Sequence, residues 1–212
     1  MNPDAFVEKF GQVKASAILR TDSQEKAALA MEAAIRGGFE IIEFTLTVPG
    51  VYDLVRDFSH RPGLIVGTGT VMDEAEAHLS VEAGACFLVS PVVDEIVIHA
   101  ARDLNVVCMP GTHTPTEMLR AHRAGAQLCK LFPSPAGGPT WVKSTLGPMP
   151  FLKIVPTNGV DEHNAADWIA AGAFAAGLVA PLFVPDDMEA GRWDVIEERA
   201  RRCLAAVQGR PV

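Results

Sequence analysis

The sequence lacks a basic block, and it lacks any apolar run near the roughly 20 residues that a membrane-spanning helix needs. Its 212 residues contain 18 Lys and Arg against 26 Asp and Glu, which gives a formal net charge of −8. This balance argues against a nucleic-acid or anionic-membrane surface and favours a small-molecule partner. The chain starts at Met1 without the basic flank and apolar stretch of a signal peptide, so we expect a cytoplasmic protein.

Paired cysteines and clusters of metal ligands are also missing. None of the four cysteines has the Cys-x-x-Cys spacing of a zinc site or a redox pair. Cys86, Cys108 and Cys129 lie in apolar runs and Cys203 lies in a charged C-terminal segment, so we expect four structural thiols. The six histidines form no His-x-Glu or His-x-x-x-His group. The sequence therefore predicts no metal and no other cofactor.

Short apolar runs alternate with segments of helical period along the whole chain. This alternation is typical of βα units around a parallel sheet, and about eight units favour a single (β/α)8 barrel over residues 1–212. An open doubly wound sheet fits less well, because no Gly-x-Gly-x-x-Gly follows the first strand. The expected strands are Ala15–Arg20, Phe39–Leu46, Leu64–Thr70, Cys86–Ser90, Val106–Pro110, Gln127–Phe132, Phe151–Thr157 and Phe174–Ala180.

The segments between the strands carry helix start and stop signals. We expect N-caps with a carboxylate three positions later at Asp22, Asp73 and Thr114, the last with proline at the first helical position. A short helix, Asn2–Gly11, precedes the first strand, and Asp186–Val207 is expected as the last outer helix. Glycines near the expected helix ends stand at Gly37, Gly84, Gly125 and Gly172.

Lys130 is the most informative polar residue, because it interrupts the apolar run Leu128–Phe132. Strand alternation would point Leu128 and Lys130 into the barrel, and Cys129 and Leu131 toward the helices. Burial would lower the pKa of the amine and make it available as a nucleophile. The alternative is a structural lysine held in an ion pair.

Glu43 and Arg20 are the expected companions of Lys130. A carboxyl group among isoleucines must be paired, hydrogen-bonded or protonated, and a raised pKa would suit Glu43 to proton transfer. Arg20 ends a strand, where a guanidinium can clamp a carboxylate or phosphate, although it could instead neutralise Glu43. The glycine-rich run Gly67–Thr70 could also let backbone amides approach an anion, as a weak signal.

Further short motifs stand in order through almost the full chain. They are Ala17–Arg20, Ile42–Leu46, Gly67–Val71, Val89–Pro91, Pro110–Glu117, Lys130–Pro133, Pro156–Val160 and Glu189–Trp193.

This ordered set resembles the class I 2-keto-3-deoxy-6-phosphogluconate (KDPG) aldolase family, which includes 4-hydroxy-2-oxoglutarate (KHG) and KDPGal aldolases. The resemblance implies a metal-free barrel, usually trimeric, that cleaves a 2-keto acid to pyruvate and an aldehyde, such as glyceraldehyde 3-phosphate or glyoxylate. It places the Schiff-base lysine at Lys130, the general acid/base at Glu43, and the contact to the pyruvyl carboxylate at Thr70. The other substrate-binding positions that it implies are Arg20, Thr47, Pro91, Phe132, Thr157, Asn158, Gly159 and Ala180.

The chain departs from the family pattern at three places. Thr47 stands where many members have arginine, and Asn158 replaces a glycine, although asparagine tolerates a positive φ. Ala180 and Pro181 replace a Gly-Ser end of the eighth strand, which removes a hydroxyl and an N–H from the usual phosphate cradle of such barrels. An aldolase of unphosphorylated 2-keto acids, a sugar-phosphate isomerase or epimerase on the same barrel, and a binding barrel without catalysis stay open as alternatives.

Overall fold

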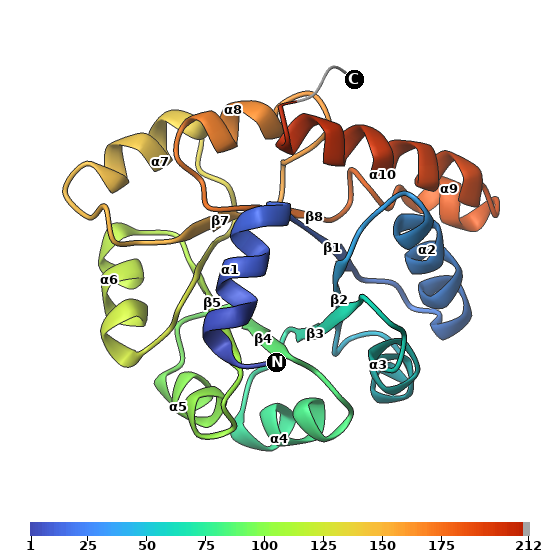
Figure 1. Cartoon of the computed structure of the whole chain (residues 1–212), viewed down its shortest axis with the longest axis horizontal. Helices are drawn as coiled ribbons and strands as arrows, with labels where there is room; N and C mark the ends of the chain where they lie inside the picture. The colour runs from blue at the N-terminus through green and yellow to red at the C-terminus, as the bar shows by residue number, and fades with distance from the viewer. Residues whose placement is uncertain (210–212) are drawn as a thin grey trace.

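Eight parallel strands form the centre of the molecule in the computed structural model, which describes residues 1–209 (Figure 1). The strands pair in the order β7-β6-β5-β4-β3-β2-β1-β8. Each of the eight expected runs overlaps one strand. Their bounds are β1 Ala15–Leu19, β2 Ile41–Thr45, β3 Ile65–Gly69, β4 Phe87–Ser90, β5 Val107–Thr112, β6 Cys129–Leu131, β7 Ile154–Pro156 and β8 Ala176–Leu178.

The sheet curls into a nearly closed barrel. β8 pairs with β1 through Ala15–Ala176 and Ser16–Gly177, which joins the last strand to the first. A single bridge, Thr157–Gly177, connects the β7 edge to β8. This circular pairing confirms the expected (β/α)8 barrel rather than an open doubly wound sheet.

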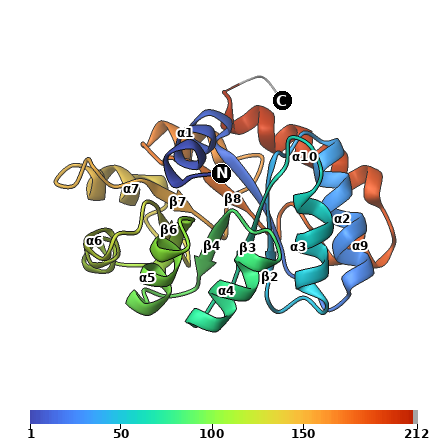
Figure 2. The same ribbon diagram turned by 60° about the horizontal axis from the view of Figure 1, so that its bottom comes forward.

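All helices but the first surround the barrel on the outside (Figures 1 and 2). No helix within residues 1–209 combines the length and the apolar character needed to cross a membrane. The helices are α1 Pro3–Val13, α2 Gln24–Arg36, α3 Val51–Ser59, α4 Glu74–Glu82, α5 Glu95–Asp103, α6 Pro115–Ala124, α7 Pro139–Leu146, α8 Ala165–Ala170, α9 Pro185–Glu189 and α10 Trp193–Val207.

The apolar core has two parts, as alternation along the strands requires. Leu128 belongs to the cluster inside the barrel, whereas Cys129 and Leu131 belong to the cluster between the strands and the helices. The predicted orientation of the sixth strand is therefore confirmed. Lys130 lies two positions after Leu128, so its side chain also points into the barrel.

Helix α1 closes one end of the barrel. Phe6 and Phe10 are fully buried in the inner cluster, and the Phe6 ring lies 4.8 Å from the Phe87 ring between centroids. Figure 1 shows α1 lying across the middle of the barrel. Because this end carries the beginnings of the strands, the open mouth lies at the carboxyl ends, where the loops that follow the strands meet.

Most elements differ from their expected bounds by a few residues, for example the first helix, which is Pro3–Val13 rather than Asn2–Gly11. Three differences have a clear physical cause. The fifth strand ends at Thr112 rather than at Pro110, because Gly111 and Thr112 pair with Lys130 and Leu131. The expected helix Asp186–Val207 is two helices, since the chain turns at Gly191 with φ 66°. The N-cap of α2 is Ser23 rather than Asp22, because the Ser23 side chain accepts from the Lys26 amide.

Candidate active site

A cavity of about 240 Å³ opens at the carboxyl ends of the strands. It collects side chains from β1, β2 and β6 and from the loops after β1, β3, β4, β6, β7 and β8. Eight of the eleven predicted site residues line it. The lining residues are Ile18, Arg20, Thr45, Thr70, Pro91, Lys130, Phe132, Thr157, Asn158, Val179 and Ala180.

Lys130 reaches this cavity from the middle of β6. The Thr112 hydroxyl donates to the Lys130 carbonyl at 2.8 Å, which ties β6 to β5 at this residue. Lys130 is 9% exposed, and its Nζ lies 5.0 Å from the centre of the Phe132 ring. Among residues 1–209 no carboxylate oxygen stands within 4.0 Å of this amine. Within these residues, Lys130 is therefore not held in a direct ion pair.

Burial lowers the pKa of the Lys130 amine, and the positive charge of Arg20 lowers it further. The charge of Glu43 acts in the opposite direction. The net direction is toward the free amine, which is the form that attacks a carbonyl carbon. The geometry and the electrostatics of Lys130 both suit a nucleophile.

Glu43 lies inside the barrel on β2 and is completely buried. Neither of its carboxyl oxygens has a hydrogen-bond partner within the described part of the chain. Burial raises the pKa of Glu43, while Lys130 and Arg20 lower it less strongly. An unpartnered buried carboxyl group is costly to a fold, and such groups gather at functional sites.

Two glycines of the run Gly67–Thr70 leave room for side chains in the barrel interior. A Cβ on Gly69 would lie 1.9 Å from Glu43 Oε1, and one on Gly67 would lie 2.5 Å from the Phe87 ring. Both glycines therefore make room for side chains of neighbouring strands. The approach of an anion to the backbone of this run stays a prediction.

Arg20 and Thr70 meet at the mouth of the cavity. Arg20 Nη2 donates to Thr70 Oγ1 at 3.1 Å, across the end of β2. Thr70 holds a left-handed backbone with φ 65°. Within residues 1–209 no ion pair joins Arg20 to Glu43 at 4.0 Å or less, so the proposed neutralisation of Glu43 by direct contact is absent.

Three predicted residues lie outside the lining of this cavity. Glu43 stands beneath it, Thr47 reaches only the Thr45 hydroxyl at 2.8 Å, and Gly159 follows Asn158 in the loop after β7. The prediction that asparagine could keep this turn is confirmed, because Asn158 has φ 80°. Three lining residues were missed, namely Ile18, Thr45 and Val179. Strand alternation could have indicated them, because they lie two positions from Arg20, Glu43 and Gly177.

The match to known proteins covers nearly the whole chain. Residues 7–199 match the family model described as KDPG and KHG aldolase. The chain belongs to this aldolase family. A protein of Rhizobium meliloti (strain 1021) named probable 2-dehydro-3-deoxy-6-phosphogalactonate aldolase is 36% identical over 193 residues, which cover 90% of this chain and 89% of that protein.

Solved aldolase structures share the fold. A native KDPGal structure superposes with a TM-score of 0.83 at 28% identity, covering 92% of this chain and 94% of that one. The KDPG aldolase of Legionella pneumophila, with pyruvate captured as a covalent carbinolamine, gives a TM-score of 0.79 at 26% identity and covers 92% and 97%. A carbinolamine is the adduct that precedes an imine, so the aldolase reaction of this family is of the class I, Schiff-base type.

This membership places the chain among carbon–carbon lyases that act through a lysine imine, a chemistry that calls for no metal. The matches give no support to the alternative of an isomerase or epimerase. Among residues 1–209, no group of three or more His, Cys, Asp or Glu side chains gathers in a way that could hold a metal ion.

Proposed function

We propose that this aldolase cleaves a 4-hydroxy-2-keto acid to pyruvate and an aldehyde, with Lys130 as the Schiff-base nucleophile and Glu43 as the general acid/base. One observation supports this assignment above the others. A buried amine whose pKa is lowered shares the barrel interior with a buried carboxyl group whose pKa is raised and whose oxygens have no partner. Opposed shifts of this kind are typical of residues that exchange protons near neutral pH.

The cleavage begins at the amine. The free Lys130 amine attacks the C2 ketone, and loss of water leaves a protonated imine. The Glu43 carboxylate, directly or through water, takes the C4 hydroxyl proton. The C3–C4 bond then breaks, its electron pair moves toward the imine nitrogen to give an enamine, and the aldehyde leaves. Glu43 returns the proton to C3, and water hydrolyses the imine to release pyruvate.

The remaining lining residues suit substrate binding. We assign the substrate carboxylate to Arg20 and Thr70, because a guanidinium and a hydroxyl stand together at the mouth. Pro91 and Phe132 supply apolar contact beside the amine, and Phe132 lies below its Nζ. Thr157, Asn158 and Ala180 form the wall that faces the aldehyde half. Substrate binding by Thr47 and Gly159 stays a prediction, because neither residue lines the cavity.

Trapping with borohydride tests the proposal. Incubation with pyruvate and borohydride should add one 1-carboxyethyl group irreversibly, and peptide mass analysis should find it on Lys130. Lys130→Met should remove both the label and aldol cleavage. Lys143→Met is the matched control, because Lys143 is an exposed lysine on α7 and its loss should change neither. Labelling at another lysine, or none at all, would contradict the proposed role.

We further propose that the chain works as a homotrimer in the cytoplasm. Support for assembly comes from three large apolar side chains that are about half exposed or more. Met72 and Val92, 49% and 50% exposed, follow the neighbouring strands β3 and β4, and Ile96, 61% exposed, lies in the first turn of α5. Large exposed apolar side chains that lie together often mark an interface. Sedimentation of the purified chain should give the mass of three copies, whereas a monomer would contradict the trimer.

A further inference from the structure

The loop that follows β6 brings the Phe132 ring to the Lys130 amine. The centre of this ring lies 5.0 Å from Lys130 Nζ, and Phe132 is part of the cavity lining. Backbone pairing holds the chain as far as Phe132, whose amide donates to the Thr112 carbonyl at 3.0 Å. Pro133 comes next, and it has no N–H with which to continue the ladder. Beyond this point, side chains tie the loop to its neighbours.

His113 ties the loop to the end of β5. Its ring nitrogen Nδ1 lies 2.9 Å from the Pro133 carbonyl oxygen. A carbonyl oxygen can only accept, so Nδ1 carries a proton and donates it to this bond. His113 does not belong to the cavity lining. Its influence on a bound substrate therefore passes through the loop that it holds.

Ser134 ties the same loop to the loop after β7. Its hydroxyl donates to the Asn158 carbonyl. The loop after β6 is thus held between its two neighbours, with one side-chain bond on each side. Without the His113 ring, the carbonyl next to Phe132 would lose the bond on the β5 side.

His113 is itself fixed to the start of α6. Its backbone amide donates to Glu117 Oε2 at 2.8 Å, and the same oxygen accepts from the Thr114 amide at 2.7 Å. Both bonds hold the pKa of Glu117 below its ordinary value, so the carboxylate stays charged and the bonds stay strong. Because Glu117 belongs to the capping box of α6, the ring of His113 is mounted on a regular helix rather than on a free loop.

From these contacts we propose that His113 is a positioning residue, which holds the loop after β6 so that the Phe132 ring stays beside the Lys130 amine. The inference rests on the proposed function, because the position of Phe132 matters to the reaction only if Lys130 forms the imine. The ring covers one side of the amine, so a displaced ring would leave the imine poorly oriented. In an active site, a displacement of about 1 Å can lower the rate about 100-fold.

Exchange of the pyruvate methyl hydrogens in D2O tests the inference with pyruvate as the probe. The Lys130 imine loses a C3 proton to give the enamine, which takes up a deuteron from the solvent, and proton NMR follows the loss of signal. For His113→Ala we expect kcat/KM of exchange to fall by about tenfold, because one of the two side-chain bonds remains. His113→Asn should recover most of this loss, since its side-chain amide can donate to the Pro133 carbonyl.

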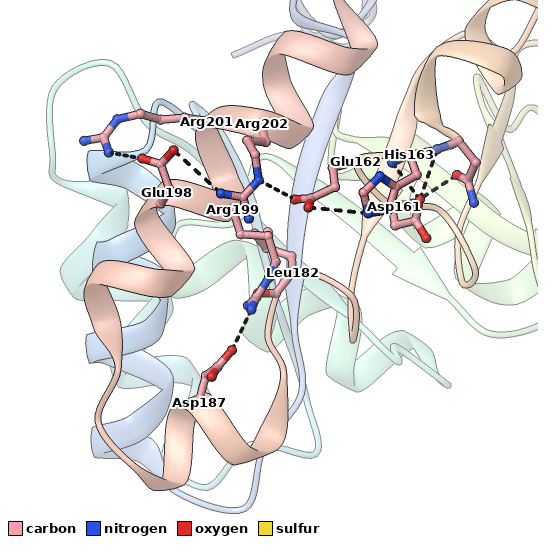
Figure 3. Close-up of polar contacts among 10 residues, drawn as sticks. Asp161, Glu162, His163, Leu182, Asp187, Glu198, Arg199, Arg201 and Arg202 are labelled. Carbon is pink, nitrogen blue, oxygen red and sulfur yellow. Dashed lines mark hydrogen bonds and ion pairs between the residues drawn. The ribbon is translucent and has the colours of Figure 1, made fainter. Parts of the chain in front are cut away.

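His163→Ala is the matched control. His163 also precedes a helix and donates its backbone amide to a carboxylate, Asp161, at 2.9 Å (Figure 3). Its side chain is 83% exposed and contacts the adjacent Glu162 at 3.6 Å rather than a neighbouring loop. Loss of this ring should leave exchange unchanged. Tm of all variants should stay near that of the parent, because both histidines are exposed.

A double-mutant cycle asks whether His113 acts through Phe132. Phe132→Ala should itself slow exchange, and adding His113→Ala should then cost less than it does in the parent, because the ring to be positioned is gone. An equal or larger cost in the Phe132→Ala background would overturn the inference. So would a loss of less than about twofold in His113→Ala, or a His113→Asn variant no faster than His113→Ala.

The parent protein separates this inference from the proposed function. If the parent exchanges pyruvate hydrogens and is labelled on Lys130, a fully active His113→Ala variant overturns only the role of His113. If the parent neither exchanges nor is labelled there, the proposed function itself fails, and the role of His113 fails with it.

Discussion

At the scale of single residues, the site depends on how burial acts on two groups of opposite charge. Burial lowers the pKa of Lys130 and raises the pKa of Glu43, while each group's charge partly opposes the shift of the other. Both net shifts are toward the uncharged forms, a free amine and a protonated carboxyl group. Neither property requires direct contact between the two side chains.

The pH dependence of imine formation tests this balance. The rate of borohydride trapping with pyruvate should rise with pH and reach half its maximum below 10.5, the ordinary value for a lysine, because burial lowers the pKa of Lys130. Glu43→Gln should move the midpoint to still lower pH, since the charge of Glu43 raises the pKa of Lys130. Glu40→Gln, which removes an exposed partner of Lys9, is the control and should leave the midpoint unchanged. A midpoint that moved upward in Glu43→Gln would contradict this account.

Gly69 tests whether the position of the Glu43 carboxyl group matters. In Gly69→Ala the new Cβ would lie 1.9 Å from Glu43 Oε1, so the carboxyl group must move. We expect kcat to fall by about 100-fold, because a displacement of about 1 Å in a catalytic group has that effect. Gly147→Ala is the control, because a Cβ there meets nothing nearer than 3.5 Å and should change kcat little. Steady-state kinetics and circular dichroism would separate a moved carboxyl group from an unfolded chain.

The sequence indicated most of the residues around Lys130 but not the contacts among them. Alternation within one strand is a local property, so the inward direction of Lys130 could be read from the run Leu128–Phe132. The contact of Arg20 with Thr70 joins residues 50 positions apart, and the room that Gly69 leaves for Glu43 depends on the register of β2 with β3. Contacts of this kind arise only when the strands are side by side.

At the scale of elements, α1 gives the barrel its closed end. Its helix begins at an Asn2 cap that accepts from the Ala5 amide, and its buried face consists of Phe6 and Phe10. The Phe10 ring also meets the Phe174 ring edge-on at 6.3 Å between centroids. The apolar interior is thereby shielded from water at the end opposite the active site.

Replacing Phe6 by alanine should weaken the closed end. Because the side chain is fully buried, we expect a loss of about 3–5 kcal/mol in the free energy of unfolding. For a chain of this length, that loss should lower Tm by about 10 °C. Glu8→Ala, an exposed change on the same helix, should stay within about 0.5 kcal/mol of the parent. Equal urea midpoints for the two variants would show that α1 does not contribute to barrel stability in this way.

Element boundaries were predicted best where a local signal decides them. The capping box of Thr114 and Glu117 begins α6 as expected, because both of its hydrogen bonds lie within four residues. The break between α9 and α10 was not predicted. It is fixed by contacts of Asp187 with Arg192 and Arg199, which the helical period of the segment does not reveal.

At the scale of the whole molecule, ion pairs join the last helices to the second helix of the chain. Lys26 and Arg36 on α2 contact Glu189 and Glu197 at 2.5 and 2.7 Å, which joins the C-terminal helices to the start of the chain. These pairs lie at the surface, where each contributes little. The ion pair of Asp187 on α9 with Arg199 on α10 differs from these surface pairs, because Asp187 is buried.

Asp187 should therefore matter more to stability than any exposed carboxylate of the same segment. In Asp187→Asn, Arg199 keeps its charge in a site that is 16% exposed and loses its partner, and we expect a loss of about 3 kcal/mol in the free energy of unfolding near pH 7. The hydrogen bond from Arg199 lowers the pKa of Asp187 in the folded state, so its stabilising effect is present above the ordinary value of 3.8 and is lost as pH falls through the lowered pKa. The difference between parent and variant should accordingly persist at neutral pH and shrink in acid. Asp186→Asn, an exposed neighbour, is the control for urea titrations at both pH values, and a difference that grew in acid would show that the carboxylate is not what holds these helices together.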